Sequence, residues 1–204
     1  MQQLLGSNLI KLEPIDQSPG LNPSAFAQGN SPYKKVYIDV VDLLSKTSII
    51  GLYFAAYWSG PCIGWGSLLQ SFKNEMNQET NNFLEIVIIP MCGSPSAMMA
   101  QERGAQNSSH LHHNLKNEDL SKDEKEMLDF QHLCGCLMMP FEEQHNIQAL
   151  KEKFQVQEIP TFVVLDRYGQ EVSRDGIYDI KKYTKQQLIT KWSENFKKDQ
   201  LQQF

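Results

Sequence analysis

The stretch that decides the fold runs from Ser48 to Cys62 and reads SIIGLYFAAYWSGPC. Residues Ser48–Ala56 form an apolar run with β-branched and aromatic members, which is too short for a typical core helix and predicts a strand buried on both faces. From Cys62 to Met76 the apolar residues recur at helical spacing, so a helix is expected to follow the strand. A second apolar run, Phe83–Met91, predicts another buried strand. The order strand, helix, strand implies a right-handed crossover and a parallel pair of strands.

Three more helices are indicated by capping signatures and by periodicity. Ser121 stands three residues before Glu124, and Thr184 stands three residues before Gln187; this spacing is typical of a capping box at the start of a helix. The third helix is marked by apolar residues at helical spacing within Ile147–Phe154.

Shorter strands are expected on either side of this central part. Val36, Ile38 and Val40 alternate with more polar residues and predict a short strand. Thr161–Asp166 predicts another strand, and a turn joins it to an antiparallel partner at 170–172. Together the segments predict one α/β domain over residues 34–198, with a central mixed β-sheet flanked by helices.

The flanks and one internal segment are polar and lack a regular pattern. Residues 1–33 contain four prolines among Gly, Ser, Asn and Gln, which predicts an extended or disordered N-terminal arm that stays free or lies along a partner. A long polar insertion is expected at about 93–120, and a short tail at 199–204.

Composition limits the class of protein. The 204 residues are 41% hydrophobic and 21% charged, which suits one domain with a real core. The net charge of −5 argues against nucleic-acid binding, and four Cys are too few for a secreted disulfide scaffold. No apolar run is long enough for a membrane span, and the first residues show no secretory signal. We therefore expect a cytoplasmic protein, or alternatively a subunit of a mitochondrial or ciliary complex, without a cofactor.

Several of these segments, in this order, resemble the thioredoxin superfamily and, more closely, its tryparedoxin and nucleoredoxin branch. The resemblance covers residues 35–197 and rests on Tyr53–Cys62, Val87–Ile89, Leu137–Phe141, Leu150–Asp166 and Gly169. It implies a thioredoxin-like fold in which a strand ends at a Trp-Cys-x-x-Cys motif that opens a helix. It also implies a cis-proline, matched here by Pro160 after Ile159, which lies beside the motif and next to backbone that can bind an extended substrate. The implied binding residues are Trp58, Gly60, Pro61, Ile159 and Pro160.

The sequence departs from this family pattern at the reactive position. In the family, the first Cys is exposed, its thiolate is favoured by the helix N-terminus, and it attacks a disulfide that the second Cys then resolves. Here Ser59 stands at the first position, and a serine hydroxyl cannot form the mixed disulfide. Cys62 matches the more buried second position, where it is either a small core residue or a residual thiol open to modification. Ile63 and Gly66–Ser67 also depart from the branch, which typically has a basic residue and Thr-Pro there.

The remaining cysteines allow several interpretations. His132, Cys134 and Cys136 are zinc-type ligands, but their spacing is not that of an ordinary zinc ribbon. A strained Cys134–Cys136 disulfide is also conceivable. The simplest interpretation is a reduced, semi-buried turn around Gly135 beside a solvated run of His110, His112 and His113. Cys92 and the irregularly spaced methionines are most simply core residues.

Two functions follow from these expectations. In the first, the chain is a thioredoxin-like protein that has lost disulfide reductase activity and serves as a binding module or accessory subunit of a multi-subunit protein assembly. The arm and the insertion would then add contact surface. In the second, it is a thiol-disulfide oxidoreductase or redox-sensing protein that uses Cys62, or Cys134 and Cys136.

Overall fold

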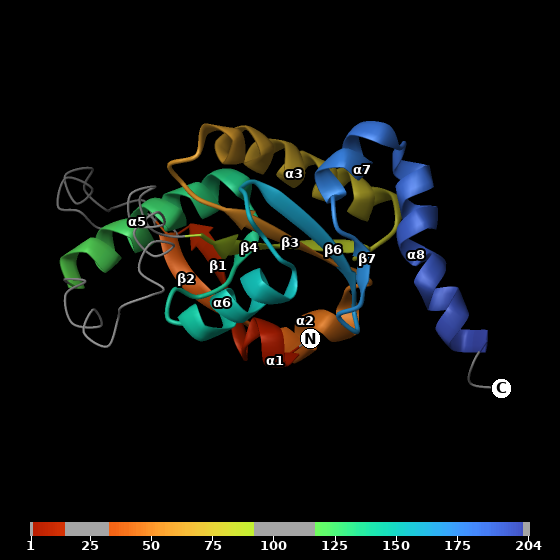
Figure 1. The fold of residues 1–204 in the computed structure, drawn as a ribbon, viewed down its shortest axis with the longest axis horizontal. Helices are drawn as coiled ribbons and strands as arrows, with labels where there is room; N and C mark the ends of the chain where they lie inside the picture. Colours follow the sequence, from red (N-terminus) through yellow and green to blue (C-terminus); the bar gives the residue numbers. More distant parts are fainter. Residues whose placement is uncertain (1, 15–32, 92–116, 202–204) are drawn as a thin grey trace, which may run out of the picture.

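The computed structural model describes residues 2–14, 33–91 and 117–201 (Figure 1). The described elements are, in chain order, α1 (Gln2–Leu5), β1 (Asn8–Pro14), β2 (Tyr33–Asp39), α2 (Val40–Lys46), β3 (Ile49–Ala55), α3 (Gly60–Glu79), β4 (Leu84–Pro90), α5 (Asn117–Cys134), β5 (Leu137–Met138), α6 (Gln144–Lys153), β6 (Thr161–Asp166), β7 (Glu171–Ser173), α7 (Gly176–Lys182) and α8 (Lys185–Leu201).

The strands form one mixed sheet in the order β2-β1-β5-β4-β3-β6-β7. β3 lies inside the sheet, where it pairs in parallel with β4, as predicted, and antiparallel with β6. All seven residues of β3 are buried, which explains its unbroken apolar sequence. β5 is much shorter than its neighbours: it has two residues, whereas β1 and β4 have seven each.

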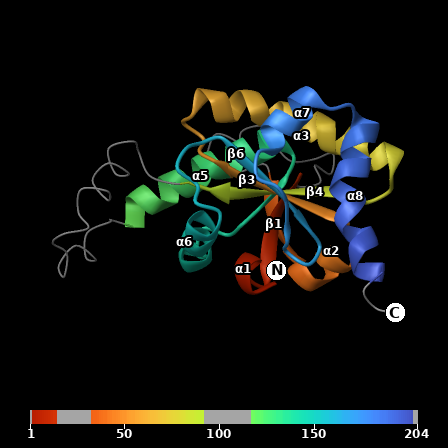
Figure 2. The ribbon, with the colours of Figure 1, turned by 45° about the vertical axis from the view of Figure 1, so that its right-hand side comes forward.

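Helices cover both faces of the sheet (Figures 1 and 2). α3, α5, α7 and α8 lie on one face, over a core cluster that includes Tyr53, Cys62, Phe162 and Trp192. α1, α2 and α6 lie on the other face, over a second cluster that includes Leu9 and Phe54. Because successive strand residues point to opposite faces, β3 contributes to both clusters. No helix in the described ranges is long and apolar enough to cross a membrane.

The N-terminal segment differs from the predicted arm. Residues 2–14 form α1 and β1, and Leu5, Leu9 and Ile10 are fully or almost fully buried. All seven residues of β1 pair with β2, and Ile10 also pairs with Met138 of β5. The folded domain therefore begins before Lys34, because the apolar residues of 4–12 complete the second core cluster. Residues 15–32, the rest of the predicted arm, lie outside the described residues.

Two helix starts also differ from the predicted ones. Val40 is not the end of a strand but the first residue of α2, because the side chain of Asp39 caps the helix by accepting from the N–H of Asp42 at 2.8 Å. α5 begins at Asn117, so Ser121 lies inside the helix rather than at its start. The rest of the predicted insertion, 93–116, lies outside the described residues.

Other predicted elements are confirmed. α6 spans the expected region, and β6 and β7 form the expected antiparallel pair. At the start of α8, the N–H of Thr184 donates to Oε1 of Gln187 at 2.9 Å, and the N–H of Gln187 donates back to Oγ1 of Thr184 at 3.4 Å. This reciprocal pair is the predicted capping box.

Candidate functional site

The Ser59–Cys62 turn connects the end of β3 to the start of α3. Ser59 is the N-cap residue of α3: its carbonyl accepts from the N–H of Ile63 at 3.0 Å, and its N–H donates to the carbonyl of Ala56 at 3.2 Å. Its side chain makes no capping hydrogen bond and is 7% exposed. A hydroxyl therefore occupies the helix start at which the family pattern has a reactive thiol.

Cys62 lies in the first turn of α3 and is completely buried. Its carbonyl accepts a hydrogen bond of 2.7 Å from the hydroxyl of Tyr53, which comes from β3 below the helix. Burial, followed by the nearby thiols of Cys62 and Cys134, raises the pKa of the Tyr53 hydroxyl, so this donor stays protonated. The Cys62 sulfur belongs to the core and is not presented to a partner at the surface.

The peptide bond between Ile159 and Pro160 is cis, as the resemblance implies. Thr161 pairs with Phe54 near the end of β3, which places Pro160 beside the strand that leads into the Ser59–Cys62 turn. Ile159 and Pro160 are half-buried, and Gly60 and Pro61 are exposed. The candidate binding residues from the two segments therefore lie at the same end of the sheet.

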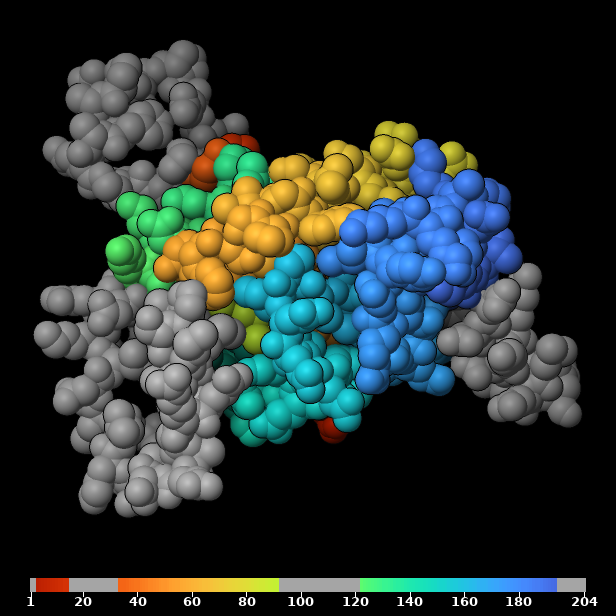
Figure 3. Space-filling view, turned by 45° about the horizontal axis from the view of Figure 1, so that its top comes forward, coloured from red at the N-terminus to blue at the C-terminus, as the bar shows by residue number. Residues whose placement is uncertain are grey.

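Two aromatic residues border this end of α3. Trp58 is half-buried, and its Nε1 is buried without a hydrogen-bond partner among the described residues. Lys181 of α7 lies over the Trp65 ring, with Nζ 5.2 Å from its centroid, and the surfaces of α3 and α7 are continuous in Figure 3. Next to them, Ile63 is 41% exposed. The turn thus opens onto a partly apolar surface.

Cys134 and Cys136 are free thiols, and both are buried. Burial, followed by the neighbouring thiols of Cys136 and Cys62, raises the pKa of Cys134. Burial raises the pKa of Cys136 to about 12, although the nearby Lys73 acts in the opposite direction. Both groups are therefore thiols rather than thiolates at neutral pH, and the conceivable Cys134–Cys136 disulfide is not formed.

The structure does not bring His132, Cys134 and Cys136 together as a metal site. His132 is exposed, and its Nε2 lies 2.7 Å from the hydroxyl of Tyr33, whereas the two sulfurs lie in the core. Over the described ranges, no group of three His, Cys, Asp or Glu side chains could hold a metal ion. His110, His112, His113 and Cys92 lie outside these ranges.

The departure from the branch at Gly66 has a packing reason. A Cβ at Gly66 would lie 2.3 Å from the Sγ of Cys134, so the glycine lets α3 and α5 approach closely. Residue 66 stands one turn after Cys62, on the same face of α3. Glycine at position 66 thus leaves room for the Cys134 sulfur.

The sequence reasoning missed the ion pair between Lys73 and Glu85, whose side chains are 13% and 21% exposed. Nζ of Lys73 donates to Oε1 of Glu85 at 2.9 Å and to the carbonyl of Gly135 at 3.3 Å. A signal was present, because Glu85 is a charged residue inside the otherwise apolar run Phe83–Met91. A charge in a buried strand needs a partner.

Comparison with known proteins gives relatives in sequence. No protein-family model matches the chain. Nucleoredoxin from Danio rerio is 27% identical over 147 residues, which is 71% of this chain and 28% of the relative. Probable nucleoredoxin 1 from Arabidopsis thaliana is 27% identical over 146 residues, which is 72% of this chain and 20% of the relative. The chain therefore spans less than a third of the length of these curated relatives.

Solved structures share the fold. Thioredoxin from Wuchereria bancrofti matches with a TM-score of 0.55 at 19% identity, over 92% of this chain and 95% of that one. Tryparedoxin II from C. fasciculata matches with a TM-score of 0.54 at 19% identity, over 89% of this chain and 86% of that one. The fold is therefore thioredoxin-like, and in sequence the chain is similar to nucleoredoxins over about 70% of its length.

Proposed function

We propose that this thioredoxin-like protein has no disulfide reductase activity and acts as a binding module, as an accessory subunit of a larger protein assembly. The observation that carries the proposal is the arrangement at the start of α3. Ser59 occupies the helix start, and the nearest thiol in the turn, that of Cys62, is completely buried.

The chemistry of disulfide exchange supports this proposal. A thiolate must attack a substrate sulfur and form a mixed disulfide, and the attacking sulfur needs access to the substrate. Ser59 provides a hydroxyl, which cannot form that bond. Cys134 and Cys136 are buried with raised pKa values, so they do not replace the missing nucleophile.

The surface around the Ser59–Cys62 turn supports a binding role. Gly60, Pro61 and Ile63 are exposed, and Pro160 lies at the same end of the sheet. An extended segment of a protein partner fits this partly apolar surface.

The alternative function is thiol-disulfide exchange or redox sensing through Cys62, or through Cys134 and Cys136. The relatives named thioredoxin, tryparedoxin and nucleoredoxin favour it. The burial of all three thiols argues against it, because each would have to become accessible before it could react.

An insulin-reduction assay in the presence of dithiothreitol tests the loss of activity. We expect the wild type to match Cys62→Ser at the background rate. Ser59→Cys should rise well above both, because it restores a reactive residue at the helix start. Wild-type reduction that Cys62→Ser abolishes would establish the alternative function instead.

The binding role is tested by quantitative affinity capture with matched surface variants. Ile63→Glu places a charge beside the Ser59–Cys62 turn, whereas Tyr168→Glu places one at the exposed turn between β6 and β7. We expect partners retained by the wild type to be lost from Ile63→Glu and kept by Tyr168→Glu. Equal retention by both variants would contradict binding at this surface.

A further inference from the structure

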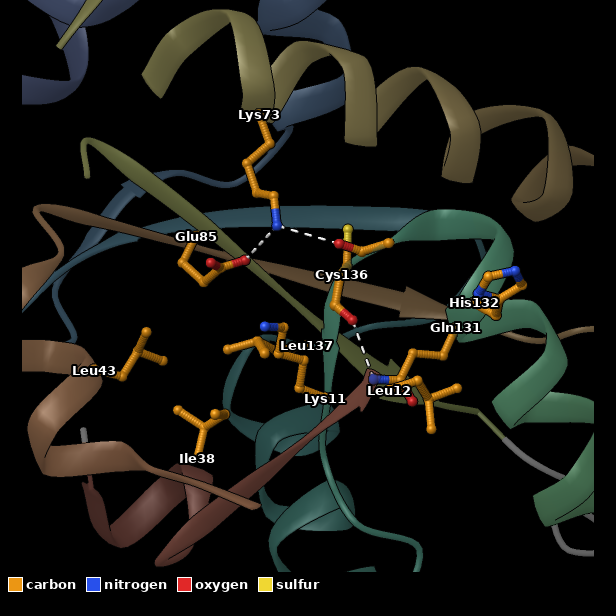
Figure 4. A pocket seen from close by; sticks show the side chains of 11 residues that line it. Lys11, Leu12, Ile38, Leu43, Lys73, Glu85, Gln131, His132, Cys136 and Leu137 are labelled. Carbon is orange, nitrogen blue, oxygen red and sulfur yellow. Dashed lines mark hydrogen bonds and ion pairs between the residues drawn. The ribbon is translucent and has the colours of Figure 1, made fainter. Parts of the chain in front are cut away.

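A cavity of about 280 Å³ lies beside β5 (Figure 4). Its walls include Lys73 of α3 and Gln131 of α5, which cover one face of the sheet, and Leu43 of α2, which covers the other. Residues of β1, β2 and β4 line it between these helices. The cavity therefore passes through the plane of the sheet.

The cavity exists because β5 is too short to fill the space between its neighbours. β4 pairs with β5 only at Val87 and Ile88, and β1 pairs with it only at Ile10. Before β5, Gly135 adopts a positive φ of 56° at the end of α5, so the chain does not continue along the sheet. The β4 stretch Leu84–Ile86 and the facing part of β1 have no β5 residue between them.

The two strands that border this gap differ in what their edges offer. The β4 edge is occupied by side chains: Asn77 binds both peptide groups of Leu84 at 2.9 Å, and Glu85 accepts from the N–H of Ile86 at 2.9 Å. On β1, the carbonyl of Ile10 faces the gap and accepts from Gln131. Because peptide groups two residues apart on a strand point the same way, those of Leu12 also face the gap.

Gln131 supplies a polar group without a partner. The side chain is 1% exposed, and its Nε2 donates to the carbonyls of Ile10 at 2.7 Å and Cys136 at 3.1 Å. These two acceptors fix the orientation of the carboxamide, and its Oε1 is buried without a hydrogen-bond partner among the described residues. A buried acceptor of this kind needs a donor, and Gln131 lines the cavity from which one can approach.

The other lining residues define the chemistry of an occupant. The charged groups are already paired: Lys11 with Glu13 at 3.1 Å, and Lys73 with Glu85 at 2.9 Å. An ionic occupant would find no free counter-charge. Four of the remaining large side chains on the walls are aliphatic, namely Leu12, Ile38, Leu43 and Leu137. His132 also lines the cavity, and its Nε2 lies 2.7 Å from the hydroxyl of Tyr33.

We propose that this gap is a binding site for an uncharged, extended segment of a partner protein that carries an aliphatic side chain. The segment pairs with the edge of β1 at Leu12 and donates to Oε1 of Gln131. It extends over about three residues, the length of the facing β4 stretch Leu84–Ile86, and does not pair with β4, whose edge is occupied by side chains. The site is independent of the proposed function. Glu85 pairs with Ile50 at the start of β3, whereas the Ser59–Cys62 turn follows the end of that strand.

The test is an NMR titration of the ¹⁵N-labelled full chain with the tripeptide Ac-Ala-Leu-Ala-NH₂. We expect saturable shifts at the Leu12 amide and the Gln131 carboxamide. Ile38→Trp, which fills the cavity, should weaken binding at least about tenfold, and Tyr37→Trp, on the exposed face of the same strand, should stay within about twofold of wild type. Leu43→Trp replaces the first variant if it does not fold. Analogues with Asp or Lys at the central position should bind more weakly.

Three results would overturn the proposal. They are the absence of saturable shifts, shifts centred on Trp58 and Pro160 instead of Leu12 and Gln131, and equally tight binding of N-acetyl-leucinamide, which would indicate a small-molecule site. None of these readouts depends on reductase activity, so a failure of this proposal can be distinguished from a failure of the proposed function.

Discussion

The end of β3 and the gap beside β5 are two regions of one sheet that are built differently. β3 pairs along most of its length on both sides and is buried throughout, and the Ser59–Cys62 turn sits on this closed part. β5 pairs through two residues and leaves a cavity. The comparison suggests that core packing, rather than the side chain of Ser59, sets the position of the turn. The walls of the gap, in contrast, are positioned by a few polar contacts, such as the Lys73–Glu85 ion pair.

The largest loss of stability is expected at Gly51 of β3, where the closed region has no room for a side chain. In Gly51→Ala, the new Cβ would lie 2.4 Å from the Phe162 ring, so we expect the free energy of unfolding to fall by about 2–3 kcal/mol. Urea denaturation measures it. The control is Gly64→Ala on the exposed side of α3, where no atom lies within 4 Å and helix propensity should raise stability by up to about 1 kcal/mol. Similar losses in both variants would contradict a tightly closed β3 region.

The polar contacts of the gap should give the next largest effect. Lys73→Met leaves the Glu85 carboxylate unpaired in a half-buried position, so we expect a loss of about 1–2 kcal/mol in urea denaturation. Adding Glu85→Gln, which keeps an acceptor for the N–H of Ile86, should recover most of it. Lys46→Met breaks a largely exposed pair with Asp42 and should cost less than about 0.5 kcal/mol. A loss from Lys73→Met as small as this control would mean that the gap does not depend on its ion pair.

The closed side also carries a buried carboxylate whose ionisation should appear in the pH dependence of stability. Burial acts to raise the pKa of Asp179, but hydrogen bonds from Lys191, Ser173 and Trp192 outweigh it and hold the pKa below its usual value. Since the pKa is lower in the folded than in the unfolded chain, this stabilisation is present above about pH 4 and is lost as the pH falls through the folded value.

Asp179→Asn tests this ionisation. The variant should be less stable than wild type by about 1 kcal/mol at neutral pH, because it loses hydrogen bonds to a charged group. The difference should shrink below about pH 4 in melting temperatures recorded from pH 3 to pH 7. A constant difference across this range would show that the carboxylate charge does not matter.

The smallest effect is expected at Ser59 itself. Its side chain makes no capping hydrogen bond, so Ser59→Ala should change the free energy of unfolding by less than about 0.5 kcal/mol. A loss near 1 kcal/mol, the usual cost of removing an N-cap serine, would show that the hydroxyl caps α3 and that the turn depends on it.

Much of the closed region could be predicted from the sequence. Each of its signals is local: the apolar runs of β3 and β4, the helical period of α3, the turn after β6 and the capping box of α8. These patterns indicate that a residue is buried but not which residues cover it, so they can be recognised from the sequence alone. Ser59 and Pro160 were located by resemblance, and their proximity follows from the pairing of β3 with β6.

The gap region could not be predicted because its contacts join distant parts of the chain. β1 is stabilised by β2, beyond a proline-rich stretch, and by Met138. The prolines of 1–33 predict an arm over the whole segment because these partners leave no local signal. The partner of Glu85 lies on α3, and Gln131 bonds to Ile10, 121 residues earlier. Neither spacing leaves a periodic signal in the sequence.

The participation of β1 in the sheet bears on how the protein can be shortened for expression. Deleting residues 1–33 as a dispensable arm would uncover the core positions now occupied by Leu5 and Leu9 and would leave β5, a two-residue strand, at the edge of the sheet. An apolar, unprotected sheet edge is a template for aggregation. In the intact chain the outer strand is β2, whose exposed Lys34 and Lys35 guard against such pairing, so shortened variants should keep residues 2–14.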